Sequence, residues 1–412
     1  MFCGFLSRRR FENYSGRSLR KSLIMNKGRM AFTQIMDFAS QDIFKVCVSR
    51  YNGNYKAKEF SCWKQFLCMA FGQLTHRESM SDTLLCLKLN TDKLYHLGIG
   101  KAVNKSTLSR SNENRDWHIF QDFGLKLIEQ ASVLYKGDNQ LELNLKGRVF
   151  ALDSTTVDLC LEVFLWAPFR STKAAIKIHT LLDLKTSIPE FIFISEGNVH
   201  DVKIMDLIPV QKGSYYIMDK AYVDFERLFS IRQEKAYFVV RAKENLQFKR
   251  ITSRVPDKTS GILCDQDIIL TGINSSNKYP EHLRRIKFYD SEYDRTFVFL
   301  TNNFKIKAQT VTQLYKHRWG IELFFKWIKQ NLKVQSFWGF SENAVKTQIW
   351  IAIAVYVLVL IARKKLKLIN SPYEILQYIS LAPFEKKPIH QVFLNMENQD
   401  VKELKCIQLK II

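Results

Sequence analysis

Apolar residues recur at three- and four-residue spacing through the first third of the chain. The segments that show this period lie between residues 30 and 135 and read "FTQIMDFA", "FSCWKQFLCMAFGQL", "SDTLLCLKL" and "WHIFQDFGLKLIEQASVLY". Such spacing places apolar side chains on one face of a helix, which can then pack into a core. The pattern therefore predicts an all-helical region over residues 25–140.

A polar stretch at residues 98–117, "GIGKAVNKSTLSRSNENRDW", interrupts these helices. Ser106 or Thr107 can cap a short helix there. Its exposed side would carry residue types that contact phosphates and base edges, namely Arg110, Asn112, Asn114 and Arg115. Two interpretations explain this stretch equally well. One is a DNA-reading helix with contacts from Arg110 and Arg115, and the other is a polar surface turn.

From residue 148 the pattern changes to short runs rich in β-branched and aromatic residues. The runs are "RVFALDSTTVDL", "AAIKIHTLLDL", "IPEFIFIS", "SYYIMDKAYVDF" and "KAYFVVRAK", and "GNVHDVKIMDLIPV" separates the third from the fourth. This order predicts an α/β fold with a mixed sheet, because three strands are followed by a helical connection, a strand, a helix and a further strand. We assign this fold to residues 141–370 and expect residues 242–305 to be a β-rich insertion, because polar turns alternate there with further strands.

The longest apolar run, "IWIAIAVYVLVLIA" at residues 349–362, predicts a buried core helix. It is shorter than the roughly 20 residues that a membrane span needs. Residues 371–412 would form a C-terminal region. The opening 24 residues are basic and nearly free of acidic residues, and they lack the order of regions found in a signal peptide. They are expected to be a disordered extension, or to precede a true start at Met25.

Charge and cysteine usage limit the possible partners and compartments. The 412 residues carry a formal net charge of +22, which favours a polyanionic partner, nucleic acid first and an anionic membrane second. Eight cysteines occur without a CxxC pair, which argues against a structural zinc site or a disulfide framework and fits the cytoplasm. No GxxxxGK[ST] phosphate loop is present, which disfavours ATP-driven chemistry.

Two aspartates stand in or directly after apolar strand segments. Asp153 lies in "FALDSTTV" and Asp219 in "YYIMDKAYVDF". A carboxylate in such a place is costly unless hydrogen bonds or a cation compensate its charge. For Asp153 the alternative is a turn residue that bonds the following Ser and Thr. Adjacent strands would bring the two carboxylates together, and a divalent cation would relieve their repulsion.

A third acidic residue, Glu322, occurs in the basic and aromatic segment "YKHRWGIELFFKWIKQNLKV" at residues 315–334. If this segment forms one helix, a polar row results, because Tyr315, Arg318, Glu322 and Lys329 lie within about 60° of one another around the helix axis. A second row, expected to pack on the sheet, is apolar and consists of Leu314, Ile321, Phe325, Ile328 and Leu332. Glu322 would then point toward the two aspartates, although its pairing with Arg318 explains part of the spacing. Trp319 and Trp327 lie off the polar row and are expected in the core.

Three carboxylates in a strongly basic protein indicate two-metal phosphoryl transfer. One ion activates the attacking water or 3′-hydroxyl and the other stabilises the leaving oxygen, with the ions about 4 Å apart. Carboxylate oxygens suit Mg²⁺ or Mn²⁺ and disfavour zinc. The expected cofactors are therefore two Mg²⁺ or Mn²⁺ ions per active site.

The same residues resemble a known family. The spacing Y-x2-R-x3-E-x6-K from Tyr315 to Lys329, "DST" at Asp153, "DKAY" at Asp219 and "LTNN" at residues 300–303 are similar to bacterial insertion-sequence DDE transposases with the YREK signature, the insertion sequence four type. The match runs in order over residues 30–370. Better-known relatives carry a tryptophan in the insertion that stacks on a flipped base. None occurs here at residues 242–305, where the stacking candidates are Phe288, Tyr289 and Tyr293.

The resemblance implies a fold, a site and a reaction. Asp153, Asp219 and Glu322 would be a catalytic and metal-binding triad on a ribonuclease H-like fold, while Tyr315, Arg318 and Lys329 would hold the DNA backbone. The protein would act as a homodimer on double-stranded DNA, excising an element at its terminal inverted repeats and pasting it into target DNA. It would work in the bacterial cytoplasm on the nucleoid, with no membrane partner. The alternatives are a catalytically silent transposase-derived DNA-binding protein and a ribonuclease H-like nuclease.

Overall fold

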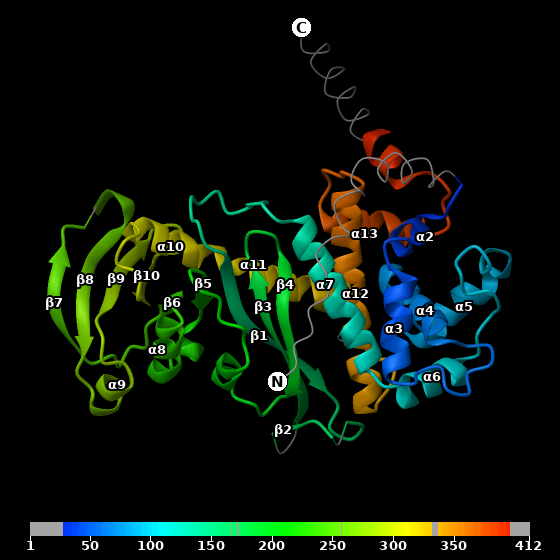
Figure 1. Ribbon diagram of the computed structural model, residues 1–412, viewed down its shortest axis with the longest axis horizontal. Coiled ribbons are helices and arrows are strands. Elements are labelled where there is room, and N and C mark those ends of the chain that lie inside the picture. The colour runs from blue at the N-terminus through cyan, green and yellow to red at the C-terminus, as the bar shows by residue number, and fades with distance from the viewer. Residues whose placement is uncertain (1–27, 165, 171–172, 257, 332–336, 396–412) are drawn as a thin grey trace, which may run out of the picture. The chain divides into compact units, whose positions relative to one another are not determined.

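The computed structural model describes residues 28–395 apart from 165, 171–172, 257 and 332–336 (Figure 1). The basic extension expected at residues 1–24 lies outside the described residues. The chain forms two compact units, a helical unit of residues 1–134 and 331–412 and a sheet unit of Tyr135–Gln330. The helical unit therefore takes up the chain again at residue 331, earlier than the boundary expected at residue 370.

The described part of the helical unit confirms the predicted helices. Among the described helices of this unit, serine side chains accept backbone N–H groups at five helix starts, at Ser40, Ser61, Ser79, Ser341 and Ser371, and so satisfy donors that a helix leaves unpaired. The helices are α2 (Ala31–Met36), α3 (Gln41–Arg50), α4 (Cys62–Leu74), α5 (Met80–Leu89), η1 (Thr91–Lys93), α6 (Lys105–Asn114), α7 (His118–Leu134), α12 (Glu342–Lys365) and α13 (Pro372–Leu381).

The predicted core helix is α12, at the centre of the helical unit. It packs along α7 and also contacts α4 and α13 (Figure 1). Its Trp350 is 1% exposed, and a Cβ atom at Gly124 of α7 would come within 3.1 Å of the Trp350 ring. The helix is long and apolar enough to cross a membrane, yet 94% of its most apolar stretch is buried inside the protein. The prediction of a core helix is confirmed.

The sheet unit begins with the strands that the sequence predicted. Its first elements are β1 (Val149–Leu159), β2 (Pro168–Arg170), β3 (Lys173–Asp183), β4 (Ile188–Glu196), the 3-10 helix η2 (Asp201–Asp206), β5 (Tyr215–Met218), η3 (Lys220–Tyr222), α8 (Phe225–Gln233) and β6 (Tyr237–Arg241). β1 pairs antiparallel with β3, and β3 pairs with β4. On its other side β1 pairs parallel with β5, and β5 pairs with β6. This confirms the mixed α/β sheet.

The segment expected to be an insertion continues the same sheet. Its elements are β7 (Phe248–Arg254), η4 (Lys258–Ser260), β8 (Ile262–Leu270), α9 (Ile273–Lys278), β9 (Leu283–Asp290) and β10 (Arg295–Thr301). β10 pairs antiparallel with β6, and β9, β8 and β7 follow in order toward the edge (Figure 1). The expected polar turn at residues 273–282 is instead largely α9, which is followed by Tyr279, a buried residue whose ring contacts Phe229 and Phe238.

Three helical segments follow β10 and lie across one face of the sheet, α10 (Ala308–His317), α11 (Trp319–Lys326) and the π-helix η5 (Trp327–Asn331). A buried charge pair anchors the loop before α10. Arg284 is 2% exposed and donates to both carboxylate oxygens of Asp265, at 2.8 and 2.7 Å. The same guanidinium donates to the carbonyls of Asn303 and Ile306. It therefore ties β8 and β9 to the loop that leads into α10.

We expect Arg284→Ala to lower the free energy of unfolding by about 3 kcal/mol, because it leaves the buried Asp265 carboxylate without its main partner. The effect falls at the lower end of the usual range, since Arg254 still contacts Asp265 at 3.2 Å. Urea unfolding followed by circular dichroism measures it. Arg295→Ala, an exposed arginine on β10, is the control and should change stability by less than about 0.5 kcal/mol. Equal midpoints for the two variants would contradict the anchoring role.

Candidate active site

The two strand aspartates are neighbours across a parallel strand pair. β1 and β5 pair with Leu152 opposite Met218, so Asp153 and Asp219 each follow directly after the last paired residue. Asp153 lies inside β1, which continues to Leu159, and the alternative of a turn residue is therefore not observed. Its Oδ1 accepts the backbone N–H of Ser154 at 2.8 Å. Asp219 directly follows β5.

The segment expected to be one helix is divided at Arg318, where α10 ends and α11 begins. The backbone of Arg318 remains helical (φ −53°, ψ −30°), so the face pattern continues through the junction. The four described members of the predicted apolar row are all buried, namely Leu314, Ile321, Phe325 and Ile328. Leu332 lies outside the described residues. Burial of this row leaves the polar row facing the aspartates.

Arg318 links two of the three predicted catalytic acids. Its guanidinium donates one hydrogen bond to Oδ2 of Asp153 at 2.7 Å and another to Oε1 of Glu322 at 2.6 Å. The Arg318 side chain is 15% exposed, so these charge-assisted bonds form largely out of solvent, where they are strong. One guanidinium thus holds Asp153 and Glu322 on either side of it.

Tyr315 and Lys329 hold the remaining parts of the site. The Tyr315 hydroxyl donates to Oδ1 of Asp219 at 3.0 Å, and burial together with Asp219 raises the pKa of Tyr315. Lys329 donates to the carbonyl oxygen of Thr156 on β1 at 2.6 Å. Burial lowers the pKa of Lys329. The structure therefore brings all four members of the polar row to the middle of β1 and the end of β5.

The electrostatics of the site favour a bound cation. Burial raises the pKa of Asp153 to about 6, even though Arg318 and the N–H of Ser154 act in the opposite direction. Glu322 and Asp219 raise it further, because each places negative charge nearby. A buried carboxylate beside two others is stabilised in its charged form by a cation of higher charge than one guanidinium.

The donor set fits a hard divalent ion. Asp153, Asp219 and Glu322 offer only carboxylate oxygens, which Mg²⁺ and Mn²⁺ prefer. Within the described part of the chain, no three Asp, Glu, His or Cys side chains are gathered tightly enough to hold a metal ion as they stand. Arg318 lies between Asp153 and Glu322. The guanidinium contacts one oxygen of each acid.

A polar network that the sequence did not single out supports β1 from its opposite face. Asp201, at the start of η2, accepts the Ser154 hydroxyl at 2.7 Å and pairs with Lys177 at 3.2 Å. His179, directly opposite Ser154 in the β1–β3 register, is fully buried, and burial lowers its pKa to about 4. Successive residues of a strand point to opposite faces, so the network lies behind Asp153. This alternation is the signal that could have identified it.

Lys177 and His200 have different environments. The Lys177 side chain is 13% exposed and also donates to the Val199 carbonyl. His200 is exposed and precedes η2 without capping it through its side chain. Asp224 caps α8 by accepting the N–H of Arg227.

The short helix of the polar stretch exists, but one of its two predicted DNA contacts points inward. α6 begins at Lys105 with Asn104 at the N-cap, in place of Ser106 or Thr107. Arg110 is exposed. Arg115 donates to Oε1 of Gln65 at 2.9 Å and to the carbonyl of Phe60. Its guanidinium is therefore used within the helical unit.

Asn112, also expected on the exposed side of α6, is 1% exposed and accepts a hydrogen bond from Gln65. The reason is periodicity. Asn112 and Arg115 follow the buried Leu108 by four and seven residues, and that spacing places all three on one face of the helix. The expectation of an exposed side chain is wrong at Asn112 and Arg115, while Arg110 on the other face remains accessible.

One aromatic side chain differs from expectation. Trp319 was expected in the core, but it is 59% exposed, because the apolar row already fills the buried face of α11. Of the stacking candidates, Tyr289 and Tyr293 are exposed at the end of β9 and the turn after it. The Tyr289 hydroxyl donates to Asp294 at 2.8 Å. Phe288 is half-buried.

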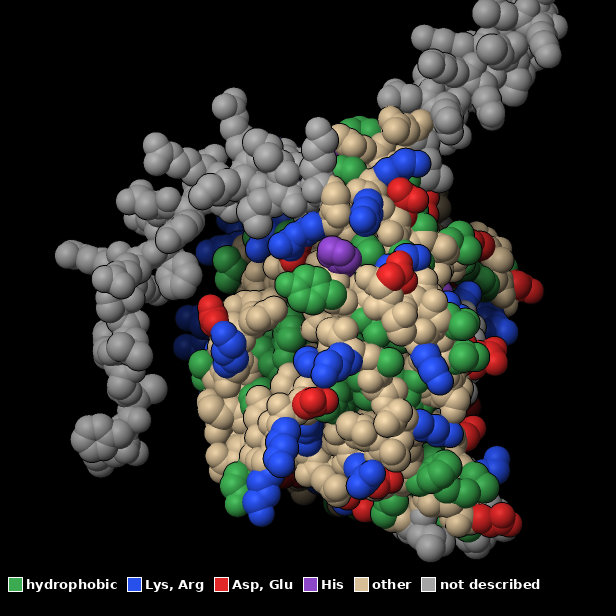
Figure 2. Space-filling view, turned by 90° about the vertical axis from the view of Figure 1, so that its right-hand side faces the viewer, with side chains coloured by type: hydrophobic (Ala, Val, Ile, Leu, Met, Phe, Trp, Pro, Cys, Tyr) green, Lys and Arg blue, Asp and Glu red, His purple; other side chains and the backbone are tan. Residues whose placement is uncertain are grey.

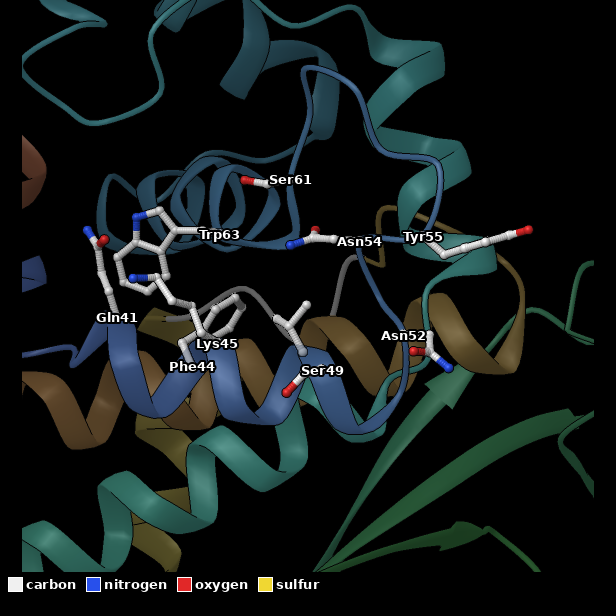
Figure 3. Close-up of a pocket in the computed structure, with 10 residues that line it drawn as sticks. Gln41, Phe44, Lys45, Ser49, Asn52, Asn54, Tyr55, Ser61 and Trp63 are labelled. Atoms are coloured by element: carbon white, nitrogen blue, oxygen red, sulfur yellow. The ribbon is translucent and has the colours of Figure 1, made fainter.

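The helical unit has a mixed surface and a pocket beside α3. On the face shown in Figure 2, Lys and Arg side chains lie among acidic and apolar ones. A pocket of about 540 Å³ lies between α3 and the start of α4 (Figure 3). Phe44 and Trp63 form its apolar wall, with ring centroids 5.1 Å apart. Lys45, Asn52 and Asn54 are among its polar lining.

Comparison with known sequences matches both parts of the chain to families. The family described as Transposase DDE domain matches residues 144–358, a range that contains Asp153, Asp219 and Glu322. The family described as Domain of unknown function (DUF4372) matches residues 27–100, within the helical unit.

Individual relatives carry related descriptions. A putative transposase of Sinorhizobium fredii is 33% identical over 230 residues, 55% of this chain and 64% of the relative. A probable transposase for an insertion sequence element of Geobacillus stearothermophilus is 30% identical over 209 residues, 50% of this chain and 54% of the relative. A putative transposase for an insertion sequence element of a Synechocystis species is 26% identical and is matched over 72% of its length. The chain thus spans less than two thirds of the first two relatives.

Proposed function

The chain belongs to the Transposase DDE domain family, and on this premise we propose that it excises and reinserts its own insertion sequence. In this proposal it binds the terminal inverted repeats and cleaves them with divalent metal ions. It then joins the freed ends to target DNA. The proposal includes the finer assignment to the YREK-signature, insertion sequence four type, because Tyr315, Arg318, Glu322 and Lys329 keep the complete spacing.

One observation carries the proposal, namely the connection of three acids from three separate segments. Arg318 bonds both Asp153 and Glu322, and Tyr315 bonds Asp219. No core requires three carboxylates at this place, since burial of charge is unfavourable unless it is compensated. The mixed sheet supports the ribonuclease H-like fold that the resemblance implies.

Asp153, Asp219 and Glu322 are the residues that would hold Mg²⁺ or Mn²⁺, in the proposal as two ions. When bound, these ions supply the charge that activates the attacking oxygen and stabilises the leaving one. Tyr315 orients the Asp219 carboxylate through its hydroxyl. Arg318 offsets part of the negative charge of Asp153 and Glu322, and its planar guanidinium is suited to bind a phosphate.

Further DNA contacts follow from the position and charge of side chains. Lys329, fixed on the Thr156 carbonyl, keeps further N–H donors of its ammonium group for a phosphate beside β1. In the helical unit we propose Arg110 as an exposed DNA contact and assign Arg115 to holding α6 in place. The net charge of +22 supports DNA as the partner, and binding of two element ends calls for a homodimer on DNA.

The experiment that tests the proposed function is a cleavage assay with the element's own ends. Purified protein is incubated with linear DNA that carries these ends, in Mg²⁺, in Mn²⁺ and in EDTA, and the strands are separated on a denaturing gel. We expect metal-dependent nicks at the element boundary, and none with scrambled ends. Binding without cleavage under all conditions would instead support a catalytically silent DNA-binding protein. Cleavage of branched DNA regardless of terminal sequence would support a ribonuclease H-like nuclease.

A further inference from the structure

A continuous groove leads away from Asp219 past the ends of β5 and β6. Its first part has a volume of about 570 Å³ and is lined by Asp219, Lys220, Ala221, Lys243, Glu244 and Asn245. A second part, of about 590 Å³, shares Lys243 and Asn245 with the first and extends toward α9. Because the two parts share these residues, they form one groove that begins at a proposed catalytic acid. Each part has the size of a pocket for a small molecule.

The lining of the groove is rich in groups that bind nucleic acid without reading its sequence. Lys220 is exposed beside Asp219, Lys243 lies where the two parts meet, and Lys278 lies at the far end. The second part also has amide and hydroxyl side chains, namely Asn245, Gln247, Asn274 and Ser275. Its apolar lining includes Phe225 and Ile273. Single-strand grooves combine lysines along the backbone with flat apolar surfaces against the bases.

The structure also shows how the lysines are held along the groove. The Lys243 ammonium donates to the Val223 carbonyl at 3.1 Å, which directs its chain along the wall. Lys278 pairs with Glu226 at 3.2 Å, and both side chains are well exposed, at 49% and 70%. An exposed pair of this kind contributes little stability. A phosphate can therefore replace Glu226 as the partner of Lys278 at small cost.

We propose that this groove binds a single strand of DNA that continues from the cleavage point at Asp219. The proposal rests on the proposed function, since it places the scissile bond at Asp153, Asp219 and Glu322. Two acids of the groove, Asp219 and Glu244, line its catalytic end, where metal ions would neutralise charge. A third acid, Asp224, lines the second part, and Arg227 pairs with it at 3.0 Å. Lys278 and the amides lie at the other end, where a strand leaves the site. The strand is thus held apart from its complement on one side of the cut.

The test compares two DNA molecules that share the same duplex, one blunt and one with a single-stranded tail at the end that is cut. Binding is measured in EDTA by fluorescence anisotropy over a range of salt concentrations, so that no cleavage occurs. The variant is Lys243→Gln with Lys278→Gln. The matched control is Lys212→Gln, an exposed lysine before β5, at the opposite end of that strand from Asp219.

We expect the double variant to lose the preference for tailed DNA. Two lost phosphate contacts on a single strand reduce the salt slope of log K by about 1.4, which corresponds to roughly 25-fold weaker binding at 0.1 M salt. Binding of the blunt duplex should change by less than about threefold, and the control should bind both molecules like the wild type. Lys278→Gln alone breaks only an exposed ion pair, and it should show about half of the change in slope. This single variant tests the proposal even if the double variant does not fold.

Two outcomes would overturn the proposal. One is an equal loss of affinity for tailed and blunt DNA in the double variant, and the other is a loss in Lys212→Gln as large as in the groove variants. Failure of the proposed function would look different. In that case the wild type would still prefer the tailed DNA in EDTA, but it would make no cut at the element ends when Mg²⁺ is added.

Discussion

Glu322→Gln is expected to reduce cleavage at the element ends by about 10³-fold or more while the protein still folds and binds uncut DNA. The substitution keeps the shape of the side chain and an oxygen that can accept from Arg318, but it removes the negative charge. A metal ion contributes several kcal/mol of transition-state stabilisation, and a factor of 10³ in rate corresponds to about 4 kcal/mol. Asp153→Asn and Asp219→Asn should behave alike, because all three acids are proposed to hold the same ions.

The measurement is the initial rate of nicking on end-labelled DNA, beside binding of the same DNA in EDTA. Glu142→Gln is the control, since Glu142 is an exposed acid of the same unit and should leave the rate unchanged. A Glu322→Gln protein that cuts at the wild-type rate would remove Glu322 from the active site. Loss of both binding and cutting would indicate a structural role.

Arg318→Ala is expected to have the second largest effect, in two separate measurements. Without the guanidinium, Asp153 and Glu322 face each other with no counterion, so the metal-free protein should lose about 2–3 kcal/mol of stability, since breaking one side of a partly buried charge pair costs about this amount. Cleavage should fall about 100-fold, because the proposed phosphate contact is lost as well. Arg318→Lys should recover only part of either loss, because an ammonium group cannot reproduce the planar fork that bonds both acids.

Metal ions distinguish this explanation from a general packing defect. Mg²⁺ should raise the urea midpoint of Arg318→Ala more than that of the wild type, because the ion replaces the missing positive charge between the two acids. Lys316→Ala, which breaks only an exposed pair with Glu292, is the control and should show the wild-type response to Mg²⁺. An equal response of Arg318→Ala and the wild type would contradict the counterion role.

Much of the site could be predicted from local pattern. Asp153 and Asp219 stand out because a charged residue interrupts apolar strand residues. Glu322 and Arg318 stand out because their spacing puts them on one face of a helix. These signals can be read from the sequence alone, since strand alternation and helical periodicity depend only on neighbouring residues. The structure brings these residues together through contacts that the pattern could suggest but not specify, above all the position of Arg318 between two acids.

The errors have two origins. Arg115 was expected on the exposed side of its helix, yet its spacing from the buried Leu108 places it on the inner face, where Gln65 and the Phe60 carbonyl lie within its reach. Trp319 was expected to be buried because tryptophan is apolar, yet other side chains already fill the buried face. Residue type indicates an average preference for the core or the surface. Whether an individual side chain is buried depends on the residues that pack against its helix or strand in the folded protein.

By itself the sequence determined most of the helices and strands, the buried apolar row of the segment that carries Glu322, and the aspartates that interrupt apolar strand residues. Only the tertiary structure decided that α12 packs with the first helices, that the segment at residues 242–305 extends the main sheet through β10, and that Asp201 supports β1 behind Asp153. The physical reason is that periodicity reveals a buried face but not its partner, because strand register and helix packing join residues far apart in the chain.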